Sequence, residues 1–337
     1  MIRNYFGKLV GACIGLMSFA DVSMALEMTA GGTGARNSKG EEKWLYYEKT
    51  VESRSAGAID MKMLIYGELG VEENLVAGIR RGRVHVSNWS GAVATTVVPE
   101  TAVLYAPFLF DDFAESDFVM DNFLFDAYFK LFADKDVYLL SWDEIGFSKV
   151  WANRPILTPD QAKGARFRVS SNAASKMFAE AIGADVIPLG FADIVSSLQT
   201  GLIEAGETGA VLYARTGIAE VAPHIINTDH NFATSLIVLR KDWLDRLPAD
   251  QRKIVIESWI PLETSRQWVR EEVAGDLARG SERGFTVHDL TKEQRDQWRK
   301  ATINTTKQLL DGAGPDAQRI WDLAQEGKKA YAARQNK

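Results

Sequence analysis

Two arginines on one short strand are the residues of this sequence best suited to holding a small anion. The segment Ala165–Val169 has the pattern of a strand, and it carries Arg166 and Arg168. Alternation along a strand sends both side chains to the same face, so the pattern alone does not separate them. A guanidinium is a planar fork that matches a carboxylate with two parallel hydrogen bonds. A structural ion pair at the surface is the alternative for either arginine.

The groups that most enzymes and metal sites require are missing or badly spaced. No pair of histidines has the spacing of zinc ligands; the four are His85, His224, His230 and His288. The tripeptide Trp89-Ser90-Gly91 lacks the first glycine of a nucleophile elbow. The segment Gly31–Gly34 lacks the further residues of a nucleotide loop. We therefore expect a binding protein rather than an enzyme, with no cofactor and no metal.

The composition is that of a globular protein with enough length for two lobes or domains. The chain has 337 residues, of which 46% are hydrophobic and 25% are charged. Its net charge is −6 and it has no long basic run, which argues against a nucleic-acid partner. Cys13 is the one cysteine, so a disulfide framework is excluded.

The first 25 residues have the order of features of a secretory signal peptide. Arg3 and Lys8 form a basic start, an apolar stretch follows over Leu9–Ala20, and Ser23–Ala25 is a small-x-small cleavage motif. The apolar stretch is too short to span a bilayer as a helix. We expect cleavage after Ala25, a periplasmic location and no membrane insertion of the mature chain. A buried N-terminal helix is the alternative.

Two separate runs of alternating strands and helices predict an α/β fold with two lobes. The first run has strands at 26–30, 59–65 and 84–87 and helices at 43–55 and 72–81. The second has strands at 165–169, 185–188 and 203–207 and helices at 173–182 and 192–200. A βαβ pattern implies parallel strands that are covered by helices.

A long helical pattern follows these runs. The helical period extends from 249 to about 281, and Pro261 lies inside it, where we expect a kink. A helix of this length could brace two lobes. Strand-like segments at 222–228 and 235–240 precede it, and amphipathic helices near 292–310 and 316–333 end the chain.

Six segments resemble, in order along the chain, the solute-binding proteins of tripartite ATP-independent periplasmic (TRAP) transporters, the DctP-like C4-dicarboxylate-binding family. These segments are Ile65–Gly70, Gly78–Val84, Tyr105–Phe110, Leu157–Val169, Gly190–Glu204 and Trp243–Pro248. The sequence departs from the family pattern at Gly67, where proline is usual, and at Thr208, where asparagine is frequent. Ser148 stands where sialic-acid-binding members have a second arginine, which argues against sialic acid.

The resemblance implies a two-lobed periplasmic-binding-protein-like α/β fold, with a ligand cleft between the lobes and a long bracing helix. We expect lobe I at residues 26–145 plus about 234–275, and lobe II at 146–233 plus about 276–337. The family's function implies a periplasmic receptor that captures a small organic acid, a carboxylate, and delivers it to TRAP membrane permease subunits.

The resemblance selects Arg168 over Arg166 as the carboxylate ligand. In a closed cleft each charge-assisted hydrogen bond from this fork would contribute about 1.5–3 kcal/mol. The other ligand-binding residues that we expect are Phe191, Trp89, Ser90, Glu207, Thr208, Glu72, Trp142 and Asn231.

Each of these residues also has a structural interpretation. Trp89 and Ser90 are expected to follow the third strand, at the carboxyl end where open α/β sheets place ligands, but a core tryptophan is the alternative. Phe191 could be a core residue at a helix start, and Glu72 could favour a helix N-terminus through its charge. Asn231 is expected near the cleft or the hinge.

Two other functions remain open at this stage. One is a periplasmic enzyme that uses cleft carboxylates on a small acid or sugar. The other is a sensor that presents its ligand to a receptor kinase on the same fold. The sequence does not identify which organic acid is bound.

Overall fold

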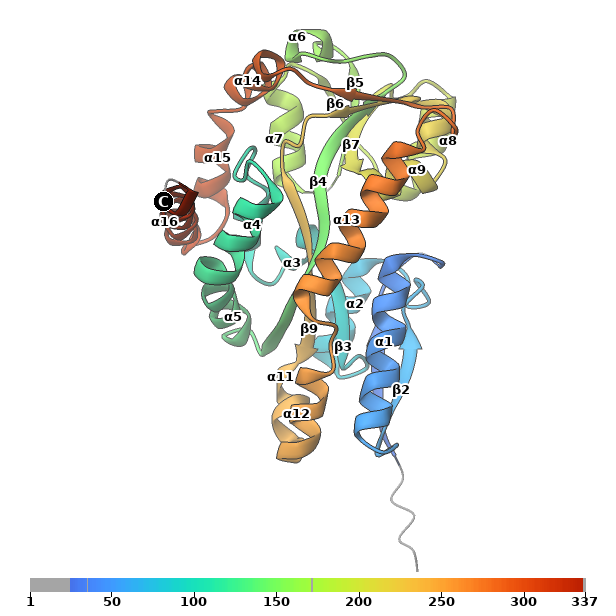
Figure 1. Ribbon diagram of the computed structural model, residues 1–337, viewed down its shortest axis with the longest axis vertical. Coiled ribbons are helices and arrows are strands. Elements are labelled where there is room, and N and C mark those ends of the chain that lie inside the picture. Colours follow the sequence, from blue (N-terminus) through green and yellow to red (C-terminus); the bar gives the residue numbers. More distant parts are fainter. Residues whose placement is uncertain (1–24, 35, 171, 336–337) are drawn as a thin grey trace, which may run out of the picture.

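The computed structural model describes residues 25–34, 36–170 and 172–335 (Figure 1). The predicted signal peptide therefore lies outside the described residues, apart from Ala25. Across the described part of the chain, none of the helices has the length and apolarity needed to cross a bilayer.

One half of the molecule, which we call the β1 half, is built on the first predicted βαβ run. Its sheet has the order β2-β1-β3-β9-β4, with β1, β2 and β3 parallel and β9 antiparallel to β3. The strands are β1 (Leu26–Gly31), β2 (Ile59–Leu64), β3 (Val86–Ser90), β9 (Phe232–Arg240) and β4 (Val137–Ala152). The helices are α1 (Lys39–Arg54), α2 (Glu72–Arg81), α3 (Gly91–Ala94), α11 (Lys241–Arg246) and α12 (Ala249–Glu257).

Local sequence explains where the first two helices begin and end. The Ser38 hydroxyl caps α1 by accepting a hydrogen bond from the backbone N–H of Glu41. The α2 helix ends at Gly82, whose φ of 74° lies in the left-handed region that glycine adopts without strain. The inner face of α1 buries Trp44, Tyr47 and Val51 against the sheet, as the helical spacing predicts.

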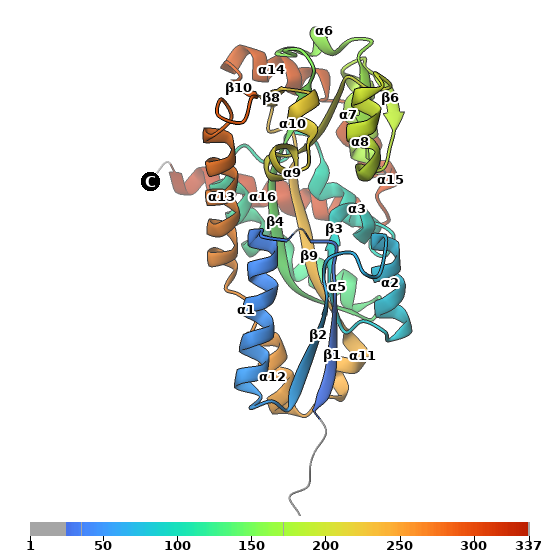
Figure 2. The ribbon, with the colours of Figure 1, turned by 90° about the vertical axis from the view of Figure 1, so that its right-hand side faces the viewer.

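The other half, the β5 half, continues the sheet in the order β4-β7-β5-β6. Its strands are β5 (Arg166–Val169), β6 (Asp185–Pro188), β7 (Ala205–Gly209), β8 (His224–Asn227) and β10 (Thr286–Asp289). Its helices are α6 (Pro159–Ala162), α7 (Ala173–Ala181), α8 (Ile194–Gln199), α9 (Ala210–Arg215), α10 (Ile218–Val221) and α14 (Lys292–Ala301). The two halves share β4, which pairs with β9 up to Phe147 and with β7 from Ser148. Figure 2 shows β4 and β9 side by side along the middle of the molecule.

The predicted long helix is interrupted rather than kinked. Residues 249–281 form α12 and then α13 (Leu262–Ala278), and Pro261 is the residue before the first turn of α13. Proline lacks an N–H and has a fixed φ, so it starts a helix more readily than it continues one. As expected of a brace, α13 runs diagonally from the β1 half to α9 of the β5 half, and it contacts β4 on the way (Figure 1).

The C-terminal segment requires a second correction. The predicted helix at 292–310 is two helices, α14 and α15 (Thr305–Gly312). The last helix, α16 (Ala317–Gln335), packs against α4 (Phe113–Val119) and the π-helical segment Met120–Leu124. These segments belong to predicted lobe I, so α16, which we predicted in lobe II, also contacts lobe I. The remaining helical segments are α5 (Phe125–Ala133) and the 3-10 turns Pro99–Tyr105 and Phe191–Asp193.

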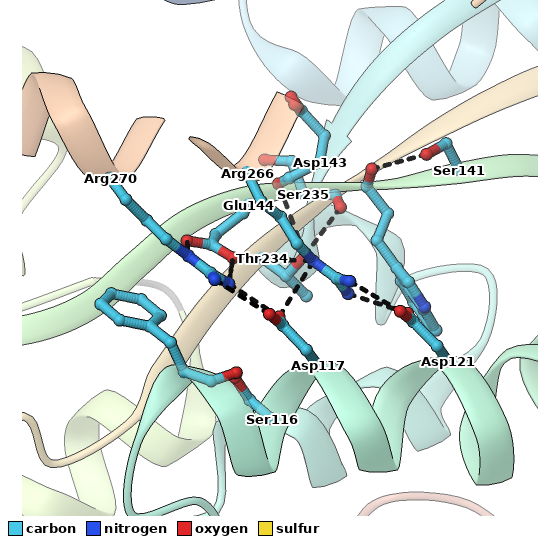
Figure 3. A network of polar contacts seen from close by, with 12 residues as sticks. Ser116, Asp117, Asp121, Ser141, Asp143, Glu144, Thr234, Ser235, Arg266 and Arg270 are labelled. Atoms are coloured by element: carbon cyan, nitrogen blue, oxygen red, sulfur yellow. Dashed lines mark hydrogen bonds and ion pairs between the residues drawn. The ribbon is translucent and has the colours of Figure 1, made fainter. Parts of the chain in front are cut away.

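Ion pairs that include the buried side chains of Arg266 and Glu144 fix α13 to the β1 half. Arg266 donates to both carboxylate oxygens of Asp121, at 2.6 and 2.8 Å, and its Nε lies 3.0 Å from Asp117. Arg270 donates to Asp117 and to Glu144, which lies in β4 (Figure 3). Two cations from one face of α13 are thus held by three carboxylates from α4, the adjoining π-helical segment and β4.

Candidate functional site

The structure separates the two arginines of β5. Arg166 is half-exposed; its Nη2 lies 2.7 Å from Glu204 Oε2, and its Nε donates to Gly201 O. Arg168 is 6% exposed, and its Nε donates to Leu189 O at 3.1 Å. Within the described residues, the two terminal nitrogens of Arg168 have no hydrogen-bond partner and no carboxylate within ion-pair distance. Arg166 therefore makes the structural ion pair, whereas the two terminal nitrogens of Arg168 remain available to a ligand.

Burial and charge act in opposite directions on Arg168. Burial lowers the pKa of the Arg168 guanidinium, and the nearby negative charge of Glu207 raises it. Arginine stays protonated even so, because its ordinary pKa is far above neutral. A buried cation with unused donors is costly unless a ligand supplies the missing acceptors. An anionic ligand that brought two carboxylate oxygens would supply them.

Strand register decides which predicted residues share a face with Arg168. Arg168 lies beside Gly206 in the parallel β5–β7 pair, and Thr208 follows two residues later on β7. Side chains two apart on a strand point to the same side, so Thr208 shares the face of Arg168, whereas Glu207 points to the other side. A side chain at Gly206 would collide with the ring of Trp151, because a Cβ there would lie 2.3 Å from it. Glycine at 206 lets Trp151 cover this face of the sheet.

Glu207 is held from behind by polar groups. Ser175 Oγ donates to Glu207 Oε1 at 2.6 Å, and His230 Nε2 lies 3.4 Å from Glu207 Oε2. Burial alone would raise the pKa of Glu207, but His230, Ser175 and the charge of Arg168 lower it to about 2. Glu207 is therefore an anion at neutral pH, so it supports Arg168 rather than binding a carboxylate ligand itself.

Asn231 lies next to this cluster, in the loop before β9. Its backbone oxygen accepts a hydrogen bond from the Ser148 N–H at 2.9 Å, which ties the loop to β4. Its side-chain Oδ1 is buried and has no partner among the described residues. Buried polar atoms are normally satisfied, so this atom is suited to a ligand or a water. The predicted position near the hinge fits this location.

Phe191 lies at the edge of the site. It starts the 3-10 turn that follows Leu189 and Gly190, and Leu189 O is the acceptor for Arg168. Phe191 is 38% exposed, so the alternative of a core residue does not apply. An exposed aromatic ring can pack on the apolar part of an acid.

The two predicted tryptophans are corrected by the structure. Trp89 and Trp142 are 0% and 1% exposed and belong to the apolar core of the β1 half. Trp142 packs against Tyr128 and Phe125, and the Nε1 atoms of Trp89 and Trp142 are buried without a hydrogen-bond partner among the described residues. Trp89 and Ser90 also end β3 rather than following it. Their aromatic type suggested stacking, but core packing is the role that the structure gives them.

Ser90 and Glu72 interact with each other. The backbone N–H and the hydroxyl of Ser90 both donate to the Glu72 carboxylate, which begins α2. Burial raises the pKa of Glu72, and the hydrogen bonds from Ser90 partly offset this rise. The pair links β3 to α2 at the carboxyl end of the strand, and it leaves Ser90 little capacity to donate to a ligand.

Tyr105 and Lys149 were not among the site residues predicted from the sequence. Tyr105 donates to Thr234 O at 2.9 Å and lies against Gly91, and burial together with the charges of Glu72 and Glu207 raises its pKa. It therefore lies between the two parts of the predicted site. Lys149, paired with Thr208 across β4 and β7, is buried and forms an ion pair with Asp229. Tyr105 begins one of the six segments that resemble the family, and this position could have drawn attention to it. Lys149 lies outside those segments, so no feature of the sequence pointed to it.

The described residues contain no cluster of three or more histidines, cysteines or carboxylates that could hold a metal ion. The candidate residues that we keep for an acid site are Arg168, Thr208, Asn231 and Phe191, which offer a guanidinium, a hydroxyl, an amide and an aromatic ring. Such a set can bind an acid through charge-assisted hydrogen bonds.

Two α/β halves that share long strands, with a long helix running from one half to the other, define the class of two-lobed ligand-binding receptors. Residues 30–311 match the family described as "Bacterial extracellular solute-binding protein, family 7". The chain belongs to this family, whose members are substrate-binding receptors of the TRAP type.

Individual relatives agree with this assignment. The "C4-dicarboxylate-binding periplasmic protein DctP" of Vibrio cholerae is 28% identical over 256 residues, 74% of this chain and 76% of that protein. The "Ectoine/5-hydroxyectoine-binding periplasmic protein UehA" of Ruegeria pomeroyi is 24% identical over 279 residues, 80% of this chain and 82% of that protein.

Solved structures share the fold. A TRAP periplasmic solute-binding protein from Desulfovibrio salexigens with bound orotic acid has a TM-score of 0.84 at 21% identity, covering 90% of this chain and 99% of that one. The sugar acid binding protein DctPAm from Advenella mimigardefordensis, in complex with galactonate, has a TM-score of 0.82 at 22% identity with the same coverage. The predicted two-lobed fold is confirmed.

Proposed function

We propose that this chain is a periplasmic receptor that binds a small organic acid through Arg168 and delivers it to a TRAP membrane permease. The observation that carries the proposal is the contrast within β5. Arg166 is paired with a carboxylate, whereas Arg168 is 6% exposed and its two terminal nitrogens have no partner among the described residues.

The chemistry of relatives supports an acid as the ligand. The family includes proteins named for binding C4-dicarboxylates, and solved structures with this fold contain succinate, glucuronate, galactonate and orotate. These molecules differ in size and in hydroxyl groups, but each carries a carboxylate. The shared group fits the planar fork of Arg168, and the differing parts would meet Thr208, Asn231 and Phe191.

Ligand capture in this proposal is a closure of the two halves. The ligand has to favour the closed arrangement over the open one, and a carboxylate that satisfies Arg168 does so. The pairing on β4 changes from β9 to β7 between Phe147 and Ser148, and we place the hinge there. The predicted lobe boundary between 145 and 146 lies two residues away.

Calorimetry with succinate, D-glucuronate, galactonate and orotate tests the proposal. We expect at least one acid to bind the wild-type protein, and Arg168→Ala to weaken that acid at least about 100-fold, since two charge-assisted bonds are lost. Arg168→Lys should also weaken it, because a point charge does not reproduce the fork.

Arg166→Ala is the matched control, because it removes a guanidinium from the same face of the same strand. It should leave the affinity within about 2-fold, as expected for a surface ion pair. Undiminished binding by Arg168→Ala would contradict the assignment of Arg168. Mass spectrometry of the acid after incubation tests the receptor against an enzyme, and chemical change of the acid would favour the enzyme.

A further inference from the structure

Three arginines at the end of α2 have side chains without partners. Arg80, Arg81 and Arg83 are exposed, and no ion pair, side-chain hydrogen bond or ring contact is found for them. Every other arginine of the described residues makes at least one such contact. We call Arg80, Arg81 and Arg83 the α2 arginine surface. It belongs to the Gly78–Val84 segment, to which the proposed function gives no role.

The α2 arginine surface borders two adjoining hollows. One has a volume of about 330 Å³ and is lined by Glu73, Val76, Ala77, Arg80, Arg81 and Thr96. The other, of about 240 Å³, shares Ala77 and Arg81 and adds Leu69, Asn74, Gly78, Arg83 and Val84. Sites that enclose a whole small molecule usually have about 300–1,000 Å³. The first hollow is at the lower end of this range and the second is below it, and both can accept individual side chains.

The charge of this surface is poorly compensated. Glu73 is the acid that lines the first hollow, and it forms no ion pair with the three arginines. Arg240 packs against Gly82 beside them, but Asp242 neutralises it at 2.5 Å. The whole chain carries a net charge of −6, so a cluster of three free guanidinium groups is a local exception on an acidic protein.

We propose that the α2 arginine surface docks an acidic segment of a protein partner. The lining combines guanidinium forks with apolar walls from Leu69, Val76 and Val84, and a peptide that carries both carboxylates and apolar side chains fills both. A flat bilayer cannot enter the hollows, and anionic lipids repel an acidic chain. A free anion uses the forks and leaves the apolar walls empty.

This inference goes beyond the organic-acid site, because none of its residues is among those proposed to bind the acid. The two proposals can therefore fail separately. In the setting of a permease-coupled receptor, a docking surface of this kind sets the association rate and makes it sensitive to salt.

Binding to a synthetic peptide tests the proposal. The probe is a short peptide of alternating glutamate and leucine, and its glutamine–leucine counterpart is the reference. We expect the wild-type protein to bind the acidic peptide at low salt, and the variant Arg80→Gln/Arg81→Gln/Arg83→Gln to bind it at least about 10-fold more weakly. The control variant Lys49→Gln/Lys62→Gln/Lys329→Gln removes the same charge at exposed lysines elsewhere and should bind as the wild type does.

The other occupants are outcomes of the same experiment. Equal loss of binding in both triple variants would overturn the proposal, since only net charge would then matter. Absence of wild-type binding to the peptide, or stronger binding to phosphatidylglycerol vesicles or to inorganic phosphate, would overturn it too. Calorimetry with the organic acids on the same variants keeps the two proposals apart, because the arginine variant should retain acid binding if Arg168 is the site.

Discussion

Two arginines of the described residues are buried, and they differ in every respect except burial. Arg266 in α13 is 7% exposed and is surrounded by Asp117, Asp121 and Glu144. Arg168 in β5 is 6% exposed and has one backbone oxygen as its acceptor. The charge of Arg266 is balanced by carboxylates of the protein itself. The charge of Arg168 has no carboxylate within ion-pair distance among the described residues, so a ligand can balance it.

The difference separates a structural role from a binding role. A buried ion pair whose hydrogen bonds are all made is rigid, and removing one partner leaves an uncompensated charge. A buried cation with free donors destabilises the unliganded protein, and a ligand gains that free energy when it supplies the acceptors. In α13, which braces the two halves, the arginine is paired with carboxylates of the protein itself. At the proposed ligand site, the terminal nitrogens of Arg168 have no such partner among the described residues.

The largest effect that we expect is from Arg266→Met. The substitution keeps most of the side-chain volume but leaves Asp121 and the buried Glu144 with fewer cations, so the free energy of unfolding should fall by about 3–5 kcal/mol. Urea denaturation measures it. Arg246→Met, which breaks an exposed ion pair with Asp242, is the control and should cost no more than about 1 kcal/mol. Similar small losses in both variants would remove the distinction that we draw for α13.

The next effect is that of Glu207→Gln, which weakens the polar support behind Arg168. We expect a loss of about 1.5–3 kcal/mol in the free energy of unfolding at pH 7, the range for hydrogen bonds to a charged group. The pKa of Glu207 is lowered from 4.5 to about 2 in the folded protein. Its contribution is therefore complete above about pH 4.5 and is lost as the pH falls towards 2.

Urea denaturation of Glu207→Gln and the wild type at several pH values measures this dependence. The difference between the two proteins should shrink as the pH is lowered below 4.5. Glu220→Gln, at an exposed glutamate without an ion pair, is the control and should show no such trend. A difference that stays constant down to pH 2.5 would show that the charge of Glu207 is not what stabilises the fold.

A smaller effect is expected from Thr208→Val, which keeps the shape and removes the hydroxyl. Thr208 shares the face of Arg168, and its hydroxyl has no partner among the described residues. Calorimetry with the acid that binds best should show affinity weakened about 2- to 10-fold, the value of one neutral hydrogen bond, with stability unchanged. Thr50→Val in α1, remote from the site, should leave affinity unchanged. Unaltered affinity in Thr208→Val would place the ligand on another face of β7.

The smallest effect on stability should come from Arg168→Met. The substitution removes the hydrogen bond from Arg168 to Leu189 O, which costs stability, but it also removes a buried cation that has no paired carboxylate, which restores some. The free energy of unfolding should therefore stay within about 1 kcal/mol of the wild type. The same urea denaturation as for Arg266→Met measures this value. A loss as large as that of Arg266→Met would mean that Arg168 is structural, and the comparison would then fail.

Local patterns predicted the elements best where one amphipathic face decides the structure. The predicted helix at 72–81 and strand at 185–188 have the bounds that the structure gives to α2 and β6. No strand was predicted at β4, because Val137–Ala152 is buried almost throughout and so lacks a regular alternation of apolar and polar residues. We predicted a kink at Pro261, and the structure instead ends one helix and begins another there. A proline gives the same local signal for both.

The candidate site was predictable in part. Residue type and the family resemblance drew attention to Arg168, Phe191 and Asn231, and their part in ligand binding stays a prediction. Trp89 and Trp142 were misjudged because a large aromatic residue packs in a core as readily as on a ligand. Ser175 and Lys149 were missed, because their roles depend on partners brought close by pairing between strands and helices far apart in the chain.

By itself the sequence determined the two βαβ runs, the common face of Arg166 and Arg168, and the family to which the chain belongs. Those features depend on neighbours along the chain, on residue periodicity and on ordered motifs. Only the tertiary structure decided which arginine is free. Glu204 lies 38 residues beyond Arg166, and the close approach of the two depends on the sheet bringing β5 beside β7. Charges are satisfied by what lies near them in space, and the fold sets that distance.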